Sequence, residues 1–240
     1  MLNIANLKKE DLGKFFEGGK SIGGNFYWTP ECIQEGLAKV KKYGFRSYIG
    51  SNESISYAKK ELEGTGIHVL GIFSFPSGNI CMETKKAELK YVIKQGADTC
   101  DGCLSMSHIK SNQWDLVKRE ANEIVEFAKK LNPKVEIKLI VEFEHVTDEE
   151  LMKSAQIIYE SGADFIKTCT GWKGGNVTAR QIRMVHDAFP TLKIKGSSQL
   201  LAFGLSGLLE IISAGATCVG TSNIEKCLAD WDLLSGLRNL

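Results

Sequence analysis

Short apolar runs alternate along the chain with longer stretches in which apolar residues recur every three or four positions. A short run rich in Val, Ile and Phe is typical of a strand that is covered on both faces. The three-to-four-residue recurrence is typical of an amphipathic helix. Seven strands are predicted in this way, near residues 46–50, 67–73, 98–104, 135–142, 163–168, 192–196 and 216–221. The helices predicted between them include 84–94, 115–131, 148–159 and 178–189.

A weak internal repeat marks the junctions between these elements. Four helix-like stretches end at a glycine that precedes an apolar run, at Tyr43-Gly44-Phe45, Gln95-Gly96-Ala97-Asp98, Ser161-Gly162-Ala163-Asp164 and Ala214-Gly215-Ala216-Thr217. Glycine is favoured there because the residue after a helix often takes a left-handed conformation. Thr147 and the segment Asn176-Val177-Thr178 have the side chains of helix N-caps. Alternation of strand and helix requires right-handed crossovers and a parallel sheet.

The number of strands favours one parallel fold. An eighth strand is predicted near Ser21–Trp28, although Gly23-Gly24 interrupts it. Eight strand–helix units predict an α/β fold of the (β/α)8 TIM-barrel class. An open doubly wound sheet is the alternative, but no glycine fingerprint opens its first unit. Residues 1–19 are predicted to form an extra N-terminal helix across the bottom of the barrel. Its apolar side is formed by Leu7, Leu12, Phe15 and Phe16.

Composition limits the domain organisation and the partners. The 240 residues are 43% hydrophobic and 25% charged and contain no linker or low-complexity tract, so we expect residues 1–240 to form a single barrel domain. The net charge of +1 gives no field that attracts nucleic acid or acidic membranes. No run approaches the ~18 apolar residues of a membrane span. The first residues lack an apolar signal core, so the expected location is the cytoplasm.

The seven cysteines do not indicate a disulfide framework or a metal site. Their number is odd, and most lie in apolar runs, as is typical of free thiols in a reducing compartment. Cys100 and Cys103 have CxxC spacing, but the sequence offers neither a second pair nor histidines at ligand spacing. We therefore expect no metal and no cofactor.

One lysine stands inside a strand-like run. Lys167 follows Ala163-Asp164-Phe165-Ile166, and a strand covered on both faces turns such a side chain toward the core or a site. A lysine that loses hydration becomes a free amine more easily and can attack a carbonyl to form a Schiff base. A strand-end lysine that reaches solvent and has no chemical role is the alternative.

The active site of a barrel lies at the C-terminal ends of its strands. These ends are predicted to carry Ser51-Asn52, Phe75-Pro76, Asp101, Glu142, Lys167-Thr168, Lys195 and Thr221-Ser222. Lys167 and Lys195 would be neighbours, and two like charges cannot both remain at low cost, so one amine would become nucleophilic. Asp101, predicted at a strand end, could move protons and hold the second lysine protonated. We expect Glu142 to form a structural ion pair with a barrel lysine, and Lys193 to lie at the bottom of its strand.

Several segments resemble the deoxyribose-phosphate aldolase family, a class of Schiff-base aldolases. The most specific is Phe165-Ile166-Lys167-Thr168-Cys169-Thr170-Gly171, which resembles the segment of the Schiff-base lysine. The resemblance covers roughly residues 30–226. The other matching segments are Phe75-Pro76-Ser77-Gly78, Gly96-Ala97-Asp98-Thr99-Cys100-Asp101, Ile194-Lys195-Gly196-Ser197 and Gly215-Ala216-Thr217-Cys218-Val219-Gly220-Thr221-Ser222.

The resemblance implies a class I aldolase of carbohydrate catabolism that cleaves 2-deoxyribose 5-phosphate to acetaldehyde and glyceraldehyde 3-phosphate. Lys167 would form the imine, Lys195 would favour its neutral form, and Asp101 with a water would move protons. The imine accepts the electrons, so no metal is needed. The substrate and its phosphate would be held by Thr168, Thr170, Gly171, Ser197, Ser198, Thr221 and Ser222, in part through backbone N–H groups. A homodimer is expected by the same resemblance.

Three departures from the family's pattern leave other functions open. The segment around Gly23-Gly24 does not reproduce the family's Asp-His-Thr signature in strand 1, and Ser198-Gln199 replaces a glycine pair at the phosphate. Some members end in a tyrosine, whereas this chain ends in Leu240. One alternative is therefore an aldolase of the same chemistry that uses a different or unphosphorylated sugar. Another is a sugar-phosphate-binding barrel without catalytic activity.

Overall fold

The structure is a computed structural model that describes residues 7–20, 28–172 and 175–238. Eight parallel strands form a closed barrel in which each strand pairs with the next, and β8 pairs back with β1. The prediction of a TIM barrel is confirmed. The strands are β1 (Phe16–Gly18), β2 (Ser47–Ile49), β3 (His68–Phe73), β4 (Thr99–Cys103), β5 (Glu136–Ile140), β6 (Phe165–Lys167), β7 (Lys193–Gly196) and β8 (Cys218–Gly220).

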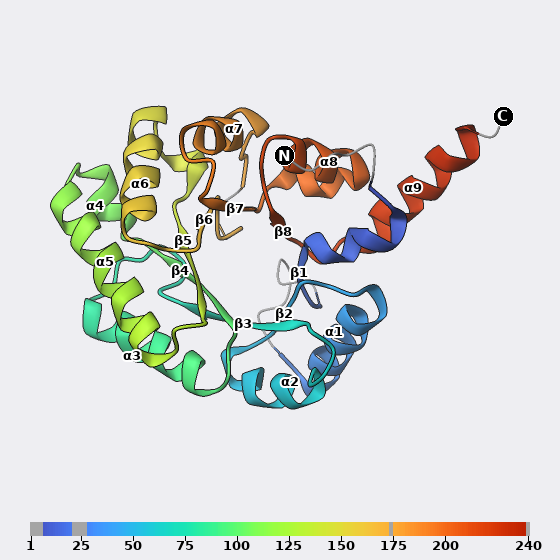
Figure 1. Ribbon diagram of the computed structural model, residues 1–240, viewed down its shortest axis with the longest axis horizontal. Coiled ribbons are helices and arrows are strands. Elements are labelled where there is room, and N and C mark those ends of the chain that lie inside the picture. Colours follow the sequence, from blue (N-terminus) through green and yellow to red (C-terminus); the bar gives the residue numbers. More distant parts are fainter. Residues whose placement is uncertain (1–6, 21–27, 173–174, 239–240) are drawn as a thin grey trace.

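Helices surround the strands, and the outer end of α9 projects away from the barrel (Figure 1). The α-helices are α1 (Pro30–Tyr43), α2 (Ile55–Glu61), α3 (Met82–Lys94), α4 (Met106–Lys110), α5 (Trp114–Leu131), α6 (Asp148–Glu160), α7 (Ala179–Ala188), α8 (Leu205–Ser213) and α9 (Ile224–Arg238). Short 3-10 helices are η2 (Lys9–Phe15), η4 (Asn52–Ser54), η5 (Phe143–His145) and η6 (Gln199–Phe203). Within the described ranges, no helix has the length and apolar character needed to cross a membrane.

The predicted signals at helix ends are confirmed. Gly44, Gly96, Gly162 and Gly215 all have positive φ angles, between 62° and 115°, which explains the repeated glycine before a strand. Thr147 and Thr178 each accept a hydrogen bond from the third residue of the following helix, and the side chain of that residue returns a bond to the cap. These two capping boxes fix where α6 and α7 begin.

The N-terminal prediction is wrong in two respects. The first strand is Phe16–Gly18, inside the segment predicted to be helical, and of the described residues 7–19 only Lys9–Phe15 forms a helix, of the 3-10 type. The strand predicted near 21–28 falls largely outside the described residues. The hydrophobic pattern did not reveal β1, because Phe16 is its only apolar side chain that points outward. The centre of the Phe16 ring lies 5.3 Å from that of Phe45, while Glu17 points inward. A three-residue strand with a charged centre has no apolar run.

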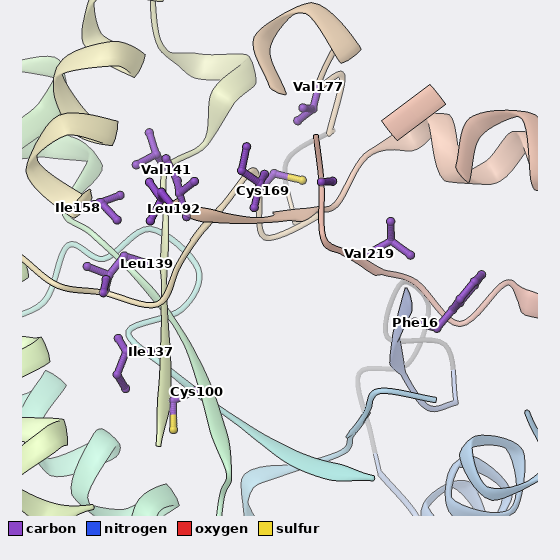
Figure 2. Packing of buried hydrophobic residues seen from close by; sticks show 14 of the residues in the cluster. Phe16, Cys100, Ile137, Leu139, Val141, Ile158, Cys169, Val177, Leu192 and Val219 are labelled. Atoms are coloured by element: carbon purple, nitrogen blue, oxygen red, sulfur yellow. The ribbon is translucent and has the colours of Figure 1, made fainter. Parts of the chain in front are cut away.

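The hydrophobic core lies between the strands and the surrounding helices. The outward-facing strand residues belong to this layer, and Figure 2 shows Phe16, Ile137, Leu139 and Val219 among them. All four are inaccessible to solvent. Successive strand residues point to opposite faces, so the residues between them line the inside of the barrel. That inner side holds the site.

Candidate active site

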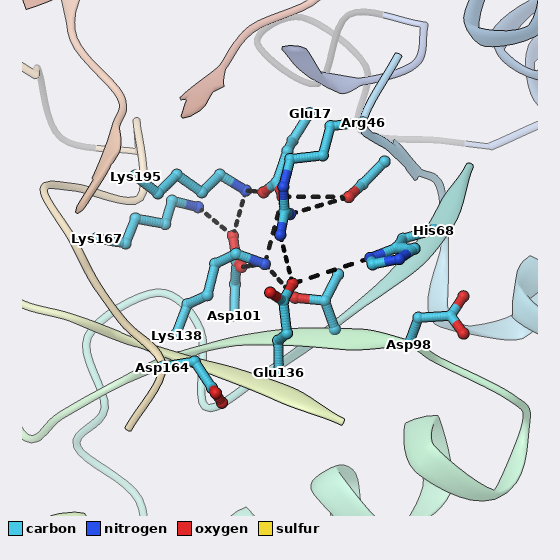
Figure 3. A network of polar contacts seen from close by, with 12 residues as sticks. Glu17, Arg46, His68, Asp98, Asp101, Glu136, Lys138, Asp164, Lys167 and Lys195 are labelled. Carbon is cyan, nitrogen blue, oxygen red and sulfur yellow. Dashed lines mark hydrogen bonds and ion pairs between the residues drawn. The ribbon is translucent and has the colours of Figure 1, made fainter. Parts of the chain in front are cut away.

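The inside of the barrel holds charged groups where barrels of this fold usually carry branched apolar side chains. Five charged side chains meet there, from β1, β4, β5, β6 and β7: Glu17, Asp101, Lys138, Lys167 and Lys195 (Figure 3). Four of them are completely buried, and Lys167 is 6% exposed. Charges removed from water are costly unless they are paired, so their contacts decide what this cluster does.

Asp101 joins the two predicted lysines. Its Oδ2 atom lies 2.8 Å from Lys167 Nζ and 2.7 Å from Lys195 Nζ. The structure therefore brings the three predicted catalytic residues together. The prediction placed Asp101 at the end of its strand, but it is the middle residue of β4. Its carboxylate therefore lies inside the barrel, below the mouth. The long lysine side chains of β6 and β7 reach inward to it.

Lys195 is held between two carboxylates. Besides Asp101, its Nζ lies 2.7 Å from Glu17 Oε2. Burial alone would lower the pKa of Lys195, but the charges of Asp101 and Glu17 outweigh burial and raise it above its ordinary value. Gly220 on β8 leaves room for this side chain, because a Cβ there would lie 3.1 Å from Lys195 Cε and would overlap Ser197 Oγ. Lys195 is therefore a fixed positive charge beside Asp101.

Both interior carboxylates are ionised. Burial would raise the pKa of Asp101, but Lys167, Lys195 and Lys138 outweigh it and lower the pKa to about 2. Burial acts in the same way on Glu17, and Lys138 and Lys195 hold its pKa well below the ordinary value. At neutral pH these groups can accept hydrogen bonds and protons from the neighbouring amines.

A second layer of charge lies on the N-terminal side of this cluster. Lys138 Nζ is 3.4 Å from Glu17 Oε1 and 3.7 Å from Asp101 Oδ1, and it donates a hydrogen bond to Thr99. Arg46 forms ion pairs with Glu17 and, at 2.5 Å, with Glu136. Figure 3 shows this continuous network from Lys167 to Glu136.

Sequence reasoning missed Glu17 and Lys138. Glu17 was missed together with its strand. Lys138 left a usable signal, since Glu136, Lys138 and Ile140 alternate with apolar Ile137 and Leu139 in a correctly predicted strand. This alternation marks residues of one face, which is the inner face in a barrel. The prediction for Lys193 agrees with the structure, where its side chain is 50% exposed and 3.4 Å from Glu136.

The surroundings of Lys167 include an aromatic ring and two thiols. Its Nζ lies 5.3 Å from the centre of the Phe75 ring. Burial raises the pKa of the Cys103 thiol, and it raises that of Cys169 to about 11, so neither is a thiolate at neutral pH. Cys103 and Cys100 stand three apart in β4, and no cluster of His, Cys, Asp or Glu suited to a metal occurs in the part of the chain that the structure describes.

The loops after β6 and β7 are tied to each other. Thr168 Oγ1 donates to Ser197 O at 2.6 Å and accepts from Ser197 N at 2.8 Å. Ser198 Oγ donates to Val177 O at 2.9 Å. Gln199 N donates to Gly175 O, also at 2.9 Å. Ser198-Gln199, which departs from the family's glycine pair, thus fastens one loop to the other.

Two carboxylates from the segment after β5 hold the loop that follows Lys167. Glu142 Oε1 accepts from Thr170 N at 2.8 Å, which differs from the predicted ion pair with a barrel lysine. Glu144 accepts from the backbone N–H groups of Gly175 at 2.6 Å and Asn176 at 3.0 Å. These bonds lower the pKa of Glu144. A backbone carrying two adjacent N–H donors attracts a carboxylate for the same reason that it attracts a phosphate.

The remaining predicted binding residues lie at the ends of β6 and β8. Gly171 has a φ of 82°, and Thr170 Oγ1 accepts from Trp172 N at 3.3 Å. Thr221 Oγ1 accepts from Asn223 N at 3.2 Å, and Ser222 Oγ accepts from Gly19 N at 3.0 Å. The hydroxyl groups of Thr170 and Thr221 stabilise their own loops and that of Ser222 ties its loop to the end of β1, so an incoming anion would be met chiefly by backbone N–H groups.

Comparisons with known proteins agree with this geometry. Residues 55–226 match the model of the DeoC/LacD family of aldolases. A deoxyribose-phosphate aldolase of Caldanaerobacter subterraneus subsp. tengcongensis is 31% identical over 85% of this chain and 87% of its own. One from a Thermoanaerobacter species is 32% identical over 86% and 92% of the two chains. The solved tetrameric deoxyribose phosphate aldolase of Aeropyrum pernix superposes with a TM-score of 0.80 at 24% identity, covering 95% of this chain and 93% of its own.

Proposed function

Because the chain belongs to the DeoC/LacD family of aldolases, we propose that it cleaves 2-deoxyribose 5-phosphate to acetaldehyde and glyceraldehyde 3-phosphate through a Schiff base on Lys167. The observation that carries the proposal is the contact of Lys167 and Lys195 with one oxygen of Asp101. An amine and a proton acceptor in contact are what imine formation requires.

Lys167 is the nucleophile because the other two interior lysines are fully buried. Lys195 is held protonated by two carboxylates, and Lys138 contacts both Glu17 and Asp101. Lys167 contacts Asp101 and is the one of the three with exposed surface. It is also the last residue of β6, at the end of the barrel where substrates enter.

The reaction begins when the neutral amine of Lys167 adds to the aldehyde carbon of the open-chain sugar. Asp101, with Lys195 beside it, relays the protons as the carbinolamine loses water and becomes an imine. The C2–C3 bond then breaks, its electrons move to the imine to give an enamine, and the 3-hydroxyl proton passes to the base. Glyceraldehyde 3-phosphate leaves. Protonation of the enamine carbon and addition of water to the resulting imine release acetaldehyde and restore Lys167.

The phosphate of the substrate would bind backbone N–H groups at Gly171, at the turn after Lys195 and at Thr221-Ser222. Thr168, Thr170, Ser197 and Ser198 would shape this part of the pocket from the ends of β6 and β7. Such N–H groups bind anions without a charged side chain, because several donors converge on the same oxygens.

An aldolase for an unphosphorylated or different acceptor is the second candidate. The bonds of Gln199 N to Gly175 O, and of Gly175 N and Asn176 N to Glu144, favour it. Three donors in the loops after β6 and β7 are thereby occupied, and Glu144 adds a negative charge to one of these loops. A phosphate would bind less strongly in such surroundings than in a loop with free donors.

Cleavage assays separate these candidates. The purified protein is given 2-deoxyribose 5-phosphate or 2-deoxyribose, and the acetaldehyde released is measured. We expect a higher kcat/KM with 2-deoxyribose 5-phosphate than with 2-deoxyribose. Lys167→Met should lose about 10⁴-fold in kcat, because it lacks the amine that forms the imine. Lys193→Met is the matched control and should retain activity, since this lysine lies at the opposite end of the barrel. Equal kcat/KM for both sugars would select the second candidate. No acetaldehyde from either sugar would reject the proposed function and leave an aldolase for a different sugar or a binding protein without lyase activity.

We propose further that the enzyme works in carbohydrate catabolism in the cytoplasm, as a homodimer with one barrel domain in each chain. The family resemblance supports these points. Light scattering tests the dimer directly, since a molar mass equal to that of one chain would exclude it.

A further inference from the structure

Among the residues that the structure describes, the interior of the barrel has one positive charge more than it has carboxylates to pair with it. Three amines, Lys138, Lys167 and Lys195, share the space with two carboxylates, Glu17 and Asp101. Further out, Arg46 forms ion pairs with both Glu17 and Glu136, and its charge and that of Glu136 cancel, so the two together leave the excess unchanged. An unpaired charge in a dry interior is costly, so the loss of one proton from the three amines stabilises the cluster.

Glu17 and Lys138 enter this balance with opposite signs. Glu17 Oε2 lies 2.7 Å from Lys195 Nζ, and Glu17 Oε1 lies 3.4 Å from Lys138 Nζ. Lys138 Nζ is also 3.7 Å from Asp101 Oδ1, the oxygen that neither Lys167 nor Lys195 occupies. Both side chains are completely buried, so water screens their charges very little.

We infer that Glu17 and Lys138 are positioning residues of opposite sign that set the pH at which Lys167 becomes a free amine. Glu17 stabilises the protonated cluster, and Lys138 destabilises it. Neither needs to touch the substrate. The inference rests on the proposed function for its catalytic meaning, because a free amine on Lys167 is what the lyase reaction consumes.

Other charged and titratable groups lie around Lys167 or toward the N-terminal end of the barrel. The surrounding set, taken strand by strand, is Glu17, Arg46, His68, Asp101, Cys103, Glu136, Lys138, Glu142, Cys169, Lys193, Lys195 and Cys218. Opposite charges lower the pKa of Glu17 and Asp101 and raise that of Lys195, in each case against the effect of burial. Burial raises the pKa of Cys218 to about 12. His68 and Lys193 lie on the N-terminal side of the network, each near Glu136.

Charge-removing variants of similar shape make the inference testable. Glu17→Gln leaves two unpaired positive charges, so Lys167 should lose its proton more readily. Lys138→Met leaves none, so Lys167 should hold its proton more tightly. The double variant restores the original excess of one. A full cycle of this kind separates the effect of charge from general damage to the site.

Two readouts are needed, one of which does not depend on catalysis. The first is the acid limb of the kcat/KM–pH profile for 2-deoxyribose 5-phosphate. The second is the rate at which cyanate carbamoylates Lys167 in the native protein between pH 5 and 10, followed by the mass of its peptide. Lys193→Met is the charge-matched control, because it removes a half-exposed lysine from β7.

The expected result is a shift of both midpoints by about one pH unit, downward in Glu17→Gln and upward in Lys138→Met. The double variant should return near the wild-type value, and Lys193→Met should move little. If Glu17→Gln does not fold, Lys138→Met and the double variant still differ, because only the first should shift the midpoints upward.

Shifts in the same direction in both single variants, or shifts no larger than that of Lys193→Met, would overturn the inference. Opposite shifts in cyanate labelling without any aldehyde release would support the charge balance while rejecting the proposed function. The two ideas therefore fail in different ways.

Discussion

The two sides of the barrel wall are built from the same strands and differ in almost everything else. In β5, Leu139 packs outward under the helices, whereas its neighbour Lys138 points into the charged interior. In β1 the same contrast separates Phe16 from Glu17. The outer side gains free energy by removing apolar surface from water. The inner side places charges where they are costly and compensates them by pairing.

This difference suggests a division of labour. Packing on the outer side holds the strands in register, so the inner side can keep a group of charges that contributes little to stability. Natural sites often sacrifice stability in this way for activity. Substitutions on the two sides should therefore change different quantities, even when they are adjacent in sequence.

Apart from the loss of the nucleophile itself in Lys167→Met, the largest expected effect on the inner side comes from Asp101→Asn. This change keeps the shape of the side chain but removes the proton acceptor between Lys167 and Lys195, so kcat should fall by about 10³-fold. The unfolding midpoint should fall as well, because Lys167 and Lys195 lose the carboxylate they share, so kcat is compared where both proteins are folded. Steady-state cleavage assays and urea unfolding measure the two quantities. An unchanged kcat would remove Asp101 from the proton relay.

On the outer side, Leu139→Ala should affect stability alone. Deleting a fully buried leucine should lower the free energy of unfolding by about 2–5 kcal/mol, with kcat nearly unchanged below the unfolding transition. Urea unfolding of this variant, compared with Lys138→Met, tests the contrast between adjacent residues. A large loss of kcat in Leu139→Ala would mean that the two sides are not independent.

A smaller loss of kcat is expected from a substitution of Gly220, the β8 residue whose missing side chain leaves space for Lys195. In Gly220→Ala the new methyl group would press on Lys195 Cε and Ser197 Oγ, displacing the ammonium from Asp101. A displacement of this kind should lower kcat by about 10²-fold. Gly236→Ala on α9 is the matched control, because nothing lies within 4 Å of its added Cβ. Equal kcat in the two variants would show that Lys195 tolerates the shift.

The smallest effect concerns acid stability. The folded-state pKa of Asp101 is about 2, and its ordinary value is 3.8. A carboxylate whose pKa is lower in the folded protein than in the unfolded chain stabilises the fold at pH values above the unfolded-state pKa. This stabilisation is lost as the pH falls toward the folded-state pKa. Stability should therefore decline between about pH 4 and pH 2, and Asp101→Asn should show a shallower decline in that window. Parallel pH curves for the two proteins would contradict this assignment.

The same contrast explains what the sequence could predict. Seven strands and the helix caps were predicted correctly because outward-facing residues and glycine caps leave local, periodic signals. Lys167, Asp101 and Lys195 were found because they stand at predicted strand ends, and the resemblance of their segments to the family pointed to the same residues. Glu17 was missed because the interior accepts a charge where a strand pattern expects an apolar residue.

The contacts between loops could not be predicted either. Glu142 and Glu144 each hold backbone N–H groups of a segment that lies about thirty residues further along the chain. Such bonds depend on the parallel pairing of β5 with β6, which places the C-terminal ends of these two strands side by side. Ser198-Gln199 could be recognised as a departure from the family's pattern, but its bonds to Val177 and Gly175 required coordinates.

Borohydride reduction in the presence of acetaldehyde measures most directly whether the interior amine of β6 attacks a carbonyl. We expect one N-ethyl group on the peptide that contains Lys167, and none in Lys167→Met. An adduct on Lys138 or Lys195, or no adduct on any interior lysine, would contradict this expectation.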